Sequence, residues 1–279
     1  MVLSRTRTQT RFVVLPPSKL AVPSIFRNVD VSNRRYDELF AAMQRFRGSV
    51  YVEDGAIQQS DLTADGRHRV AIDDDSWHVL SVDSRGRVIS CLRYLDETHA
   101  SDFDDLWVKH AALSGCPKLG RRFRGAVEQR MCQARKMRVG FGEVGGWAVA
   151  EDHRWTLEPL RIILATYGLL ELLGGCAGVA TATFRHSSAM ILRRIGLSAM
   201  GAGDQELPPY YDPQYRCQME VLQFDSRHPN PKYLEWVNEL GALLTAAPVI
   251  CRESFAGTLQ GMLRGFDLPV DRALVPAAI

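Results

Sequence analysis

A glutamate beside glycines, at the start of a short apolar segment, is the feature of this sequence with the clearest chemistry. The run is Gly142-Glu143-Val144-Gly145-Gly146-Trp147-Ala148-Val149. A carboxylate in this position can accept a proton from a substrate amine, and glycines let a substrate approach the backbone closely. Neighbouring main-chain N–H groups can hold an acyl donor, which completes the geometry that acyl transfer to nitrogen requires. The alternative interpretation is an exposed glutamate at a strand end.

The segments around this run predict a mixed sheet with helices on its faces. Apolar residues at helical spacing predict a helix over 34–47, with Ser32 or Asn33 at its start. Residues 77–82 and 87–95 predict two strands that the loop 83–86 joins as an antiparallel hairpin. Further helices are expected over 119–138, 157–173 and 187–195, further strands over 144–149, 179–183 and 218–224, and a helical tail near 232–246 and 252–264. This order of elements predicts the α/β (α+β) class.

Length and composition indicate an ordinary globular protein. The chain has 279 residues, of which 46% are hydrophobic and 24% charged. The sequence contains no apolar run of about 18 residues, so no membrane span is expected, and the N-terminus lacks the apolar segment of a secretory signal. We expect a flexible leader over residues 1–24, a central domain over 25–227 and a helical C-terminal extension over 228–279.

The cysteines and histidines do not form a recognisable metal or disulfide pattern. The six cysteines are scattered, without a CxxC pair: Cys91, Cys116, Cys132, Cys176, Cys217 and Cys251. In a chain of this length they predict buried thiols in a reducing compartment, hence a cytoplasmic protein. The seven histidines show no HExxH or other ligand spacing, so we expect no metal and no permanently bound cofactor.

Positive charge is concentrated between residues 118 and 138. Eight lysines and arginines lie there against one acid, Glu128, although the net charge of the chain is only +2. Such a local field attracts an acidic partner, and a solvated helix face is the alternative. Nucleic acid is not expected as the partner, because the only aromatic residue interleaved with these cations is Phe123.

The order of elements over residues 30–225 resembles the GNAT acyltransferase superfamily. Within it the chain is most similar to the acyl-homoserine-lactone synthases and the long-chain N-acyl amino acid synthases. The similarity rests on the helix residues 45–47, the acidic run 73–75, the strand residues 90–94 and the run 143–149. The resemblance implies a GNAT-like, mostly antiparallel sheet, an acyltransferase activity, and an acyl-carrier-protein or acyl-CoA thioester as the co-substrate.

Two departures from these families affect the expected substrates. Gly146 stands where the lactone synthases carry an arginine, which counts against S-adenosylmethionine as the substrate. The glycine-rich pyrophosphate loop of CoA-dependent GNAT enzymes is replaced by residues 151–159, in which Glu151, Asp152 and Glu158 would repel a pyrophosphate. A helix N-terminus near Thr156 would still accept one phosphate. An acyl carrier protein, with a single phosphodiester and an acidic surface, fits this pattern and the basic stretch.

The resemblance and the chemistry together assign roles to particular residues. Glu143 is the expected general base, and Arg93 would orient it or bind the carboxylate of the acceptor. The expected donor-binding residues are Trp147, Ala148, Val149, Arg154, Thr156, Arg185 and Ser188. The expected acceptor-binding residues are Arg45, Asp73, Asp74, Asp75 and Tyr211, with a solvated acidic turn and a rigid proline-tyrosine turn as the alternatives. The expected carrier-protein patch is Lys118, Arg121, Arg122, Arg124, Arg135 and Lys136.

The leading hypothesis is an N-acyltransferase that joins a long acyl chain to an amino acid or a similar small amine. A lactone synthase that uses S-adenosylmethionine is the second hypothesis. A non-catalytic GNAT-like module that binds an acyl carrier or another protein is the third, and the missing pyrophosphate loop is the feature that favours it.

Overall fold

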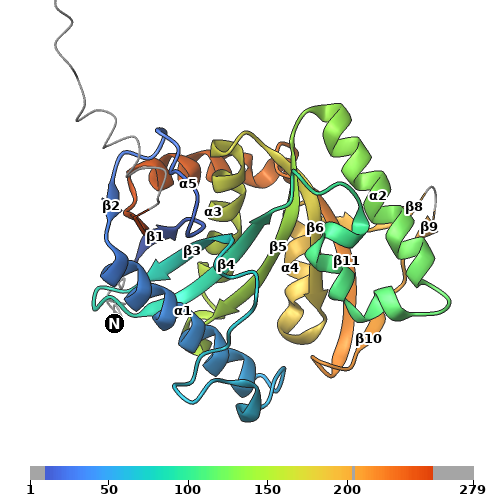
Figure 1. The fold of residues 1–279 in the computed structure, drawn as a ribbon, viewed down its shortest axis with the longest axis horizontal. Coiled ribbons are helices and arrows are strands. Elements are labelled where there is room, and N and C mark those ends of the chain that lie inside the picture. The colour runs from blue at the N-terminus through green and yellow to red at the C-terminus, as the bar shows by residue number, and fades with distance from the viewer. Residues whose placement is uncertain (1–9, 203–204, 254–279) are drawn as a thin grey trace, which may run out of the picture.

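The computed structural model describes residues 10–202 and 205–253 of the chain, and one large mixed sheet organises them (Figure 1). The strands of this sheet are β1 (Arg11–Leu15), β2 (Val29–Val31), β3 (Ser76–Val82), β4 (Val88–Asp96), β5 (Gly140–Val149), β6 (Cys176–Thr183), β7 (Ser198–Ala199), β10 (Tyr210–Asp212), β11 (Cys217–Asp225) and β12 (Val249–Cys251). A separate small ribbon pairs β8 (Gly201–Ala202) with β9 (Gln205–Glu206).

The helices are α1 (Asn33–Glu53), α2 (Gly120–Met137), α3 (Glu158–Leu172), α4 (Ser188–Ile195) and α5 (Leu234–Ala246). Short 3₁₀ turns lie at Gln59–Asp61, Phe103–Asp105, Trp107–His110, Ala112–Gly115, Glu151–His153, Arg185–Ser187 and Pro231–Tyr233. Within residues 10–202 and 205–253, no helix has the length and apolar character needed to cross a bilayer.

The strand order is β10-β11-β6-β5-β4-β3-β1-β12-β2, with β7 paired to β11. Most neighbours are antiparallel; β5 with β6, β1 with β12, and β12 with β2 are parallel. The predicted mixed, mostly antiparallel sheet flanked by helices is therefore confirmed. The predicted hairpin is β3–β4, which pairs from Ser76↔Leu95 to Val82↔Val88.

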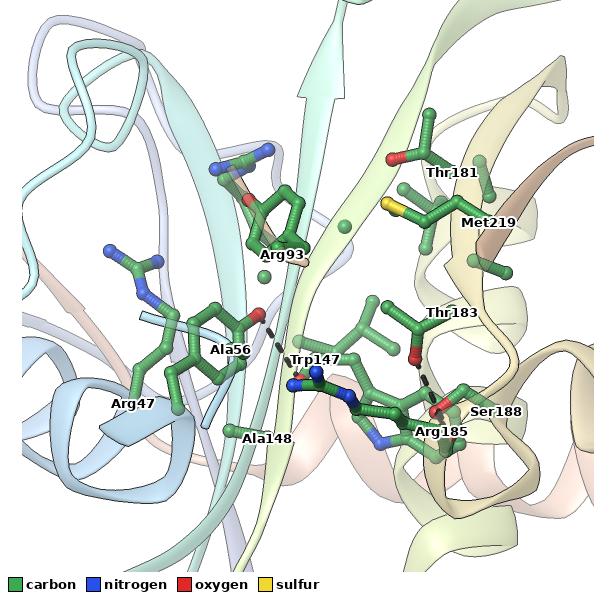
Figure 2. Close-up of a pocket in the computed structure, with 18 of the residues that line it drawn as sticks. Arg47, Ala56, Arg93, Trp147, Ala148, Thr181, Thr183, Arg185, Ser188 and Met219 are labelled. Atoms are coloured by element: carbon green, nitrogen blue, oxygen red, sulfur yellow. Dashed lines mark hydrogen bonds between the residues drawn. The ribbon is translucent and has the colours of Figure 1, made fainter. Parts of the chain in front are cut away.

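The two halves of the sheet separate between β5 and β6. Their parallel pairing runs from Gly140↔Cys176 to Glu143↔Val179 and ends there, although β5 continues to Val149 and β6 to Thr183. Figure 2 shows the two strands diverging beyond this point. Glu143 therefore lies at the vertex of a V-shaped opening in the sheet.

Helices cover both faces of the sheet. On one face α3, α4 and α5 pack on the inward side chains of the central strands, such as Leu92, Val144 and Ala180. On the other face α1 covers Leu80 and Cys91, and α2 with the turns at 103–115 covers a second set of strand residues. The second face thus carries two helices with a gap between them, and that gap contains the site described below.

The N-terminal segment is part of the sheet, and the expectation of a flexible leader over 1–24 is wrong for its described part. Residues 12–15, Phe-Val-Val-Leu, are all buried. β1 pairs with β3 from Arg11↔Val82 to Leu15↔His78 and with β12 at Val14↔Val249. Burial of these β-branched and aromatic side chains stabilises the strand despite the prolines that follow it.

The C-terminal region contributes to the same fold up to its last described residues. The predicted helix near 232–246 is confirmed as α5, which packs against α3, where Gly168 and Gly241 lie close together. β12 then lies between β1 and the edge strand β2. The second predicted tail helix, over 252–264, lies almost entirely outside the described residues. The segment 228–253 is therefore an integral layer of the domain.

Helix α1 is longer than predicted, because its buried face continues past residue 47. Ser32 caps its start as expected, since the Ser32 hydroxyl accepts a hydrogen bond from the backbone N–H of Arg35 (3.3 Å). Tyr36, Met43, Arg47 and Val50 all lie on the buried side. The apolar pattern in the sequence ends at Phe46, and Arg47 is charged. In the structure, however, the Arg47 side chain is buried, and the helix continues beyond it.

Candidate active site

A cavity of about 580 Å³ fills the opening between the diverging strands. Its walls come from β5 residues 144–149, β6 residues 180–183, the end of α1, the turns at 107–111 and the β10–β11 region. Figure 2 shows side chains from these elements surrounding the space between β5 and β6, with Thr181 and Met219 at one end and Arg185 and Ser188 at the other. This volume is in the range of pockets that enclose a drug-sized ligand.

Glu143 and Arg93 face this cavity from the centre of the sheet. Arg93 shares a strand face with Cys91, which lies under α1, and Glu143 shares one with Phe141, which lies under α2. The pair therefore lies in the gap between the two helices. Nη2 of Arg93 is 3.4 Å from Oε1 of Glu143, and the two residues are 5% and 4% exposed. Oε2 of Glu143 has no hydrogen-bond partner in the described chain.

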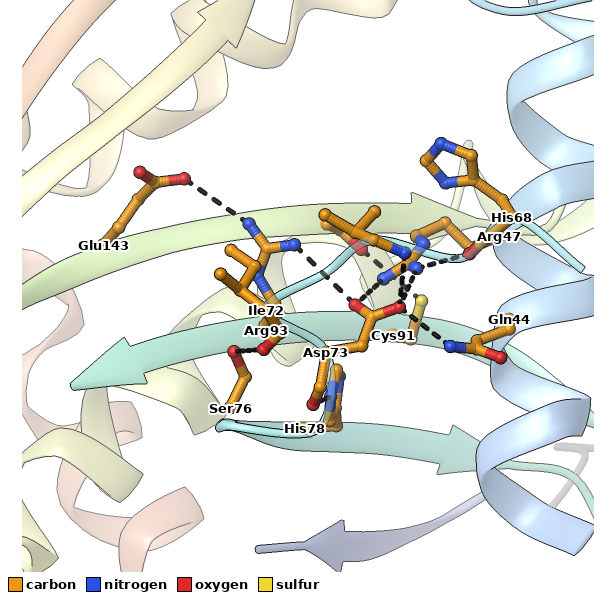
Figure 3. A network of polar contacts seen from close by, with 12 residues as sticks. Gln44, Arg47, His68, Ile72, Asp73, Ser76, His78, Cys91, Arg93 and Glu143 are labelled. Atoms are coloured by element: carbon orange, nitrogen blue, oxygen red, sulfur yellow. Dashed lines mark hydrogen bonds and ion pairs between the residues drawn. The ribbon is translucent and has the colours of Figure 1, made fainter. Parts of the chain in front are cut away.

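Arg93 belongs to a larger buried ionic network (Figure 3). Its Nη1 lies 3.8 Å from Oδ1 of Asp73, and Asp73 accepts two hydrogen bonds from Arg47, at 2.9 and 2.6 Å. Gln44 donates a further hydrogen bond to Asp73 (2.9 Å), and the carbonyl of His68 accepts one from Arg47 (2.6 Å). The two hydrogen bonds from Arg47 hold the Asp73 carboxylate in place, and this carboxylate lies against the side of the Arg93 guanidinium that is away from Glu143.

The network gives its members different protonation states. Burial raises the pKa of Glu143 from 4.5 to about 7, and Arg93 only partly opposes this. Burial also acts to raise the pKa of Asp73, but the charge and hydrogen bonds of Arg47 outweigh it and hold that pKa well below its usual value. Burial lowers the pKa of His68 and of His78 to about 4, so both imidazoles are neutral at pH 7. Glu143 is thus the group of this network that exchanges a proton near neutral pH.

A bulge in β5 shapes the wall beside Arg93. Cys91 pairs with Ala148 and Arg93 with Gly145, so β5 contains one more residue than β4 in this interval. Gly146 takes the left-handed conformation there, with φ of +62°. A β-carbon at this position would lie 3.3 Å from both Nη1 of Arg47 and the β-carbon of Arg93. The guanidinium of Arg47 therefore lies directly beside the position that the β-carbon of a side chain at residue 146 would take.

The structure brings most of the expected donor-binding residues to the cavity. Trp147, Ala148, Val149, Arg154, Arg185 and Ser188 all line it. Thr156 does not: it is exposed, and its hydroxyl donates to the carbonyl of His153 (2.7 Å) and accepts from the backbone N–H of Glu158 (3.1 Å). Thr156 shapes the turn before α3 and lies outside the pocket wall.

The expected acceptor residues are only partly brought together. Asp73 is buried in the network behind Arg93, whereas Asp74 pairs with Arg252 (3.2 Å) and Asp75 is exposed. None of these three carboxylates lines the cavity within the described chain. Residues 71–75 form consecutive turns, in which the backbone N–H groups of Asp73 and Asp75 donate to the carbonyls of Val70 and Ile72, so the three acidic side chains have different surroundings.

For two further acceptor candidates, Arg45 and Tyr211, a residue close by in the sequence faces inward and the candidate itself faces outward. Arg45 lies on the exposed side of α1, 3.6 Å from Asp65, and Arg47 is the arginine that faces inward. Tyr211 is 56% exposed on β10 and points away from the pocket, whereas Tyr215 lines it. The phase of each element explains why Arg45 and Tyr211 face outward, because helix and strand side chains turn with fixed periods, and Tyr215 lies in the turn after β10.

The basic stretch forms the predicted helix α2, and its cations have different environments. Arg122 donates to the carbonyl of Glu206 (3.2 Å), Arg124 pairs with Asp104 (2.5 Å), and Arg135 donates to the carbonyl of Ala100 (2.6 Å). The remaining patch residues are exposed: Lys118, Arg121 and Lys136. Part of the predicted carrier-protein patch therefore serves intramolecular contacts.

Aromatic and acidic residues that the sequence interpretation missed also form the site. Tyr51 of α1 donates to the carbonyl of Trp147 (3.3 Å) and meets Tyr215 edge to face at 6.5 Å. Asp212 holds the turn that presents Tyr215, since its carboxylate accepts from the backbone N–H of Tyr215 (3.2 Å). Helical spacing from the buried Met43 and Arg47 is the sequence signal that would have pointed to Tyr51.

Glu97 is a second buried carboxyl near the site. Its Oε1 accepts a hydrogen bond from the backbone N–H of Trp107 (2.5 Å), which anchors the turns whose residues 107–111 line the cavity. Burial raises the pKa of Glu97 to about 7. Its sequence context, after the end of β4, carries no motif that would have identified it.

Comparison with known proteins relates this fold to acyl-transferring enzymes. No protein-family model and no curated protein matches the chain. Among solved structures, a CoA-dependent acyl-homoserine lactone synthase, BjaI, with SAM and isopentyl-CoA is similar at 15% identity and a TM-score of 0.52, over 91% of this chain and 100% of that one. The same enzyme with MTA matches at 14% identity, a TM-score of 0.52 and the same coverage.

FeeM, an N-acyl amino acid synthase from uncultured soil microbes, is similar at 12% identity and a TM-score of 0.45, over 79% of this chain and 93% of that one. The likeness to BjaI extends over nearly the whole chain and shows that this protein has the fold of an acyl-homoserine lactone synthase. The fold expected from the family resemblance is confirmed.

Proposed function

We propose that this protein is an N-acyltransferase that moves an acyl group, of long chain, from a thioester to the amine of an amino acid or a similar small acceptor. The observation that carries the proposal is the Glu143 carboxyl. It is buried at the vertex of the opening between β5 and β6, has an unpartnered Oε2 among the described residues, and faces a cavity of about 580 Å³. A buried carboxyl with a pKa near 7 suits a general base at neutral pH.

In this proposal Glu143 takes a proton from the acceptor ammonium, directly or through a water. The free amine then attacks the thioester carbonyl carbon, and the new C–N bond forms as the carbonyl oxygen becomes an oxyanion. Backbone N–H groups of β5 between Trp147 and Val149 stabilise this oxyanion or hold the amides of the donor arm. Collapse of the intermediate breaks the C–S bond, and the leaving thiolate takes up the second proton, which the attacking nitrogen loses as the neutral amide forms.

The donor arm enters at the end of the cavity formed by Arg154, Arg185 and Ser188. A single phosphate near Arg154 and Arg185 suits an acyl carrier protein, and acyl-CoA is the alternative donor. The exposed Arg121 and Lys136 of α2, and Lys118 just before it, would then contact the acidic surface of the carrier. The acyl tail occupies the opposite end of the cavity, where Val108, Ala180 and Met219 supply apolar walls.

The acceptor binds beside Glu143, between Tyr51 and Tyr215. Arg93 lies next to this space, so its guanidinium can meet an acceptor carboxylate or keep Glu143 oriented. Asp73 contributes indirectly, because it positions Arg93 and Arg47 from behind. Asp74, Asp75, Arg45 and Tyr211 do not line the cavity, so they do not contact the acceptor in this proposal.

An assay with purified protein tests the function. The protein is incubated with acyl-CoA or an acylated carrier protein of several chain lengths and a mixture of amino acids. Free thiol is followed with a thiol reagent, and N-acyl products are identified by mass spectrometry. We expect acceptor-dependent thiol release that Glu143→Gln reduces at least about a hundredfold. No thiol release with any donor and acceptor would reject the function.

A lactone synthase is the second candidate, favoured by the likeness to BjaI, which was solved with SAM. The bulge at Gly146 counts against it, because Arg47 fills the space beside this glycine. Methylthioadenosine released from S-adenosylmethionine in the same assay would distinguish the lactone synthase from an amino acid acyltransferase.

A further inference from the structure

Asp54 connects the two sides of the cavity at the end formed by Arg154, Arg185 and Ser188, which we call the cavity mouth. It is the residue that follows α1, and its carboxylate is 17% exposed. Oδ1 of Asp54 lies 2.7 Å from Nη1 of Arg154, in the loop after β5, and 3.2 Å from Nε2 of His186, in the turn after β6. One carboxylate oxygen therefore contacts both segments that border the diverging strands.

The backbone of Asp54 reinforces this connection. Its carbonyl accepts a hydrogen bond from Nη1 of Arg185 (3.0 Å), while Nη2 of Arg185 donates to the carbonyl of Arg216 (3.0 Å). The turn that carries these groups holds His186 and Ser187 in the left-handed conformation, with φ of 49° and 61°. Non-glycine residues in this conformation are held by surrounding contacts, and Asp54 supplies several of them.

The negative charge of Asp54 also affects the electrostatic field at this end of the cavity. Asp54, Arg154, Arg185 and His186 all line the cavity, so its charge lies beside the cations nearest to the incoming donor phosphate. The C-terminal end of a helix adds a partial negative charge to that of the carboxylate. Beside it, the loop after β5 carries the exposed acids Glu151 and Asp152. The two arginines therefore face a local field that is much less positive than their number suggests.

We infer that Asp54 is a specificity-determining residue, which selects donors with one phosphate group against more highly charged donors. The inference rests on the proposed function, since it assigns the donor phosphate to this mouth. A donor with a single phosphodiester can share Arg154 and Arg185 with Asp54. A donor with a diphosphate and a further phosphate, such as CoA, brings several negative charges close to a fixed carboxylate. The repulsion grows with the charge of the donor.

Binding of unacylated probes tests this inference without turnover. The probes are CoA, 4′-phosphopantetheine and uncharged pantetheine, measured by calorimetry with wild type and Asp54→Asn. The substitution keeps the size of the side chain and the contacts of the backbone but removes the negative charge. We expect affinity to rise about tenfold for CoA, about threefold for phosphopantetheine and not at all for pantetheine. The gain should shrink at high salt, because mobile ions screen exposed charge.

Asp65→Asn is the matched control. Asp65 lies in the loop that follows the same helix and pairs with Arg45 and Arg67 outside the cavity. The change in net charge is identical, so a general effect of charge would appear in both variants. We expect all three affinities to stay within about twofold of wild type in the control variant.

A second variant separates selection by charge from a structural role. If Asp54 acts through Arg154, then Asp54→Asn should strengthen CoA binding less in an Arg154→Gln background than in wild type. Weaker binding of all three probes to Asp54→Asn would show that Asp54 only anchors the mouth, and would overturn the inference. Equal gains for charged and uncharged probes, or no gain for CoA, would overturn it as well. Since no acceptor or acyl group is present, failure of acyl transfer would reject the proposed function and leave this result standing.

Discussion

Arg93 lies 3.4 Å from one carboxylate oxygen of Glu143, and the other oxygen of Glu143 is buried without a hydrogen-bond partner among the described residues. Asp73, which is itself hydrogen-bonded to Arg47, lies 3.8 Å from the other side of the Arg93 guanidinium, so Arg93 is shared between two carboxylates. Burial outweighs the charge and the hydrogen bond of Arg93 and raises the pKa of Glu143 to about 7. This arrangement and the cavity in front of it determine how the protein should respond to pH and to substitution.

The pH dependence of stability should reveal the buried Glu143 directly. Its pKa rises from 4.5 to about 7 on folding, so between these values the folded protein binds a proton that the unfolded chain has lost. Stability from this group is therefore fully present below pH 4.5 and falls as the pH rises to 7, by on the order of 3 kcal/mol in total.

Chemical denaturation of wild type and Glu143→Gln at a series of pH values measures this. The difference in unfolding free energy should move in favour of the glutamine variant as the pH rises, because glutamine does not titrate. Parallel stability curves for the two proteins would show that Glu143 has an ordinary pKa.

The Arg47–Asp73 pair should be essential for stability. Replacement of Arg47 by Met leaves the Asp73 carboxylate buried without its closest cation, with hydrogen bonds from Gln44 and the backbone N–H of Val70 and with Arg93 at 3.8 Å. We expect a loss of about 3–5 kcal/mol in urea denaturation. Arg45→Met is a matched control two residues earlier on α1, where the partner Asp65 is exposed. It should change stability by less than about 0.5 kcal/mol. Similar losses for both variants would contradict the buried network.

Gly146 should tolerate no side chain. Gly146→Ala places a β-carbon in the left-handed conformation, 3.3 Å from Arg47 and Arg93, so we expect a loss of about 1–2 kcal/mol together with reduced acyl transfer. Gly125→Ala on α2 meets no atom within 4 Å of the new β-carbon and should stabilise the protein by up to about 1 kcal/mol. Thermal melting measures the change in stability, and the thiol assay measures the change in acyl transfer. A Gly146→Ala variant with the stability and activity of wild type would show that the glycine at the bulge is not required.

Filling the far end of the cavity should shorten the accepted acyl chain. Thr181 lies on β6 beyond the point of divergence, beside Met219, and both line the cavity. We expect Thr181→Phe to lose kcat/KM for long donors by at least about tenfold while short donors react as before. Competition among acyl donors of mixed length, read by mass spectrometry of the products, measures this selectivity. An unchanged length profile would place the acyl tail elsewhere.

The central elements were predictable because each carries its own periodic or turn signal. Two short, largely apolar runs joined by a glycine-containing loop identified β3 and β4, and the apolar run after Glu143 identified β5. β1 was missed because its partners are β3 and β12, and β12 lies more than 230 residues away. Four buried residues followed by two prolines do not show on their own that a partner strand exists.

The site was predictable by region and less so by individual residue. The sequence pointed correctly to Glu143 and Arg93 as neighbours in the sheet, but it selected Arg45 where Arg47 faces inward and Tyr211 where Tyr215 does. Arg47 lies two residues along the same helix from Arg45, whereas Tyr215 lies in the turn after the strand of Tyr211. Which side chain faces inward is decided by packing that a local pattern does not contain. The pair Asp54-Gly55 indicated a turn, but nothing in the local pattern assigned Asp54 to the site, because its partners Arg154 and His186 come from loops far along the chain.

The pH profile of acyl transfer by wild type and Glu143→Gln tests the central claim most directly. With saturating acceptor, the rate of thiol release should rise with pH through an inflection near 7 and level off above it, because Glu143 must lose its proton to act as a base. In Glu143→Gln the rate should fall at least about a hundredfold and the inflection should vanish. A glutamine variant that keeps the rate and the inflection of wild type would contradict the assignment of Glu143 as the base.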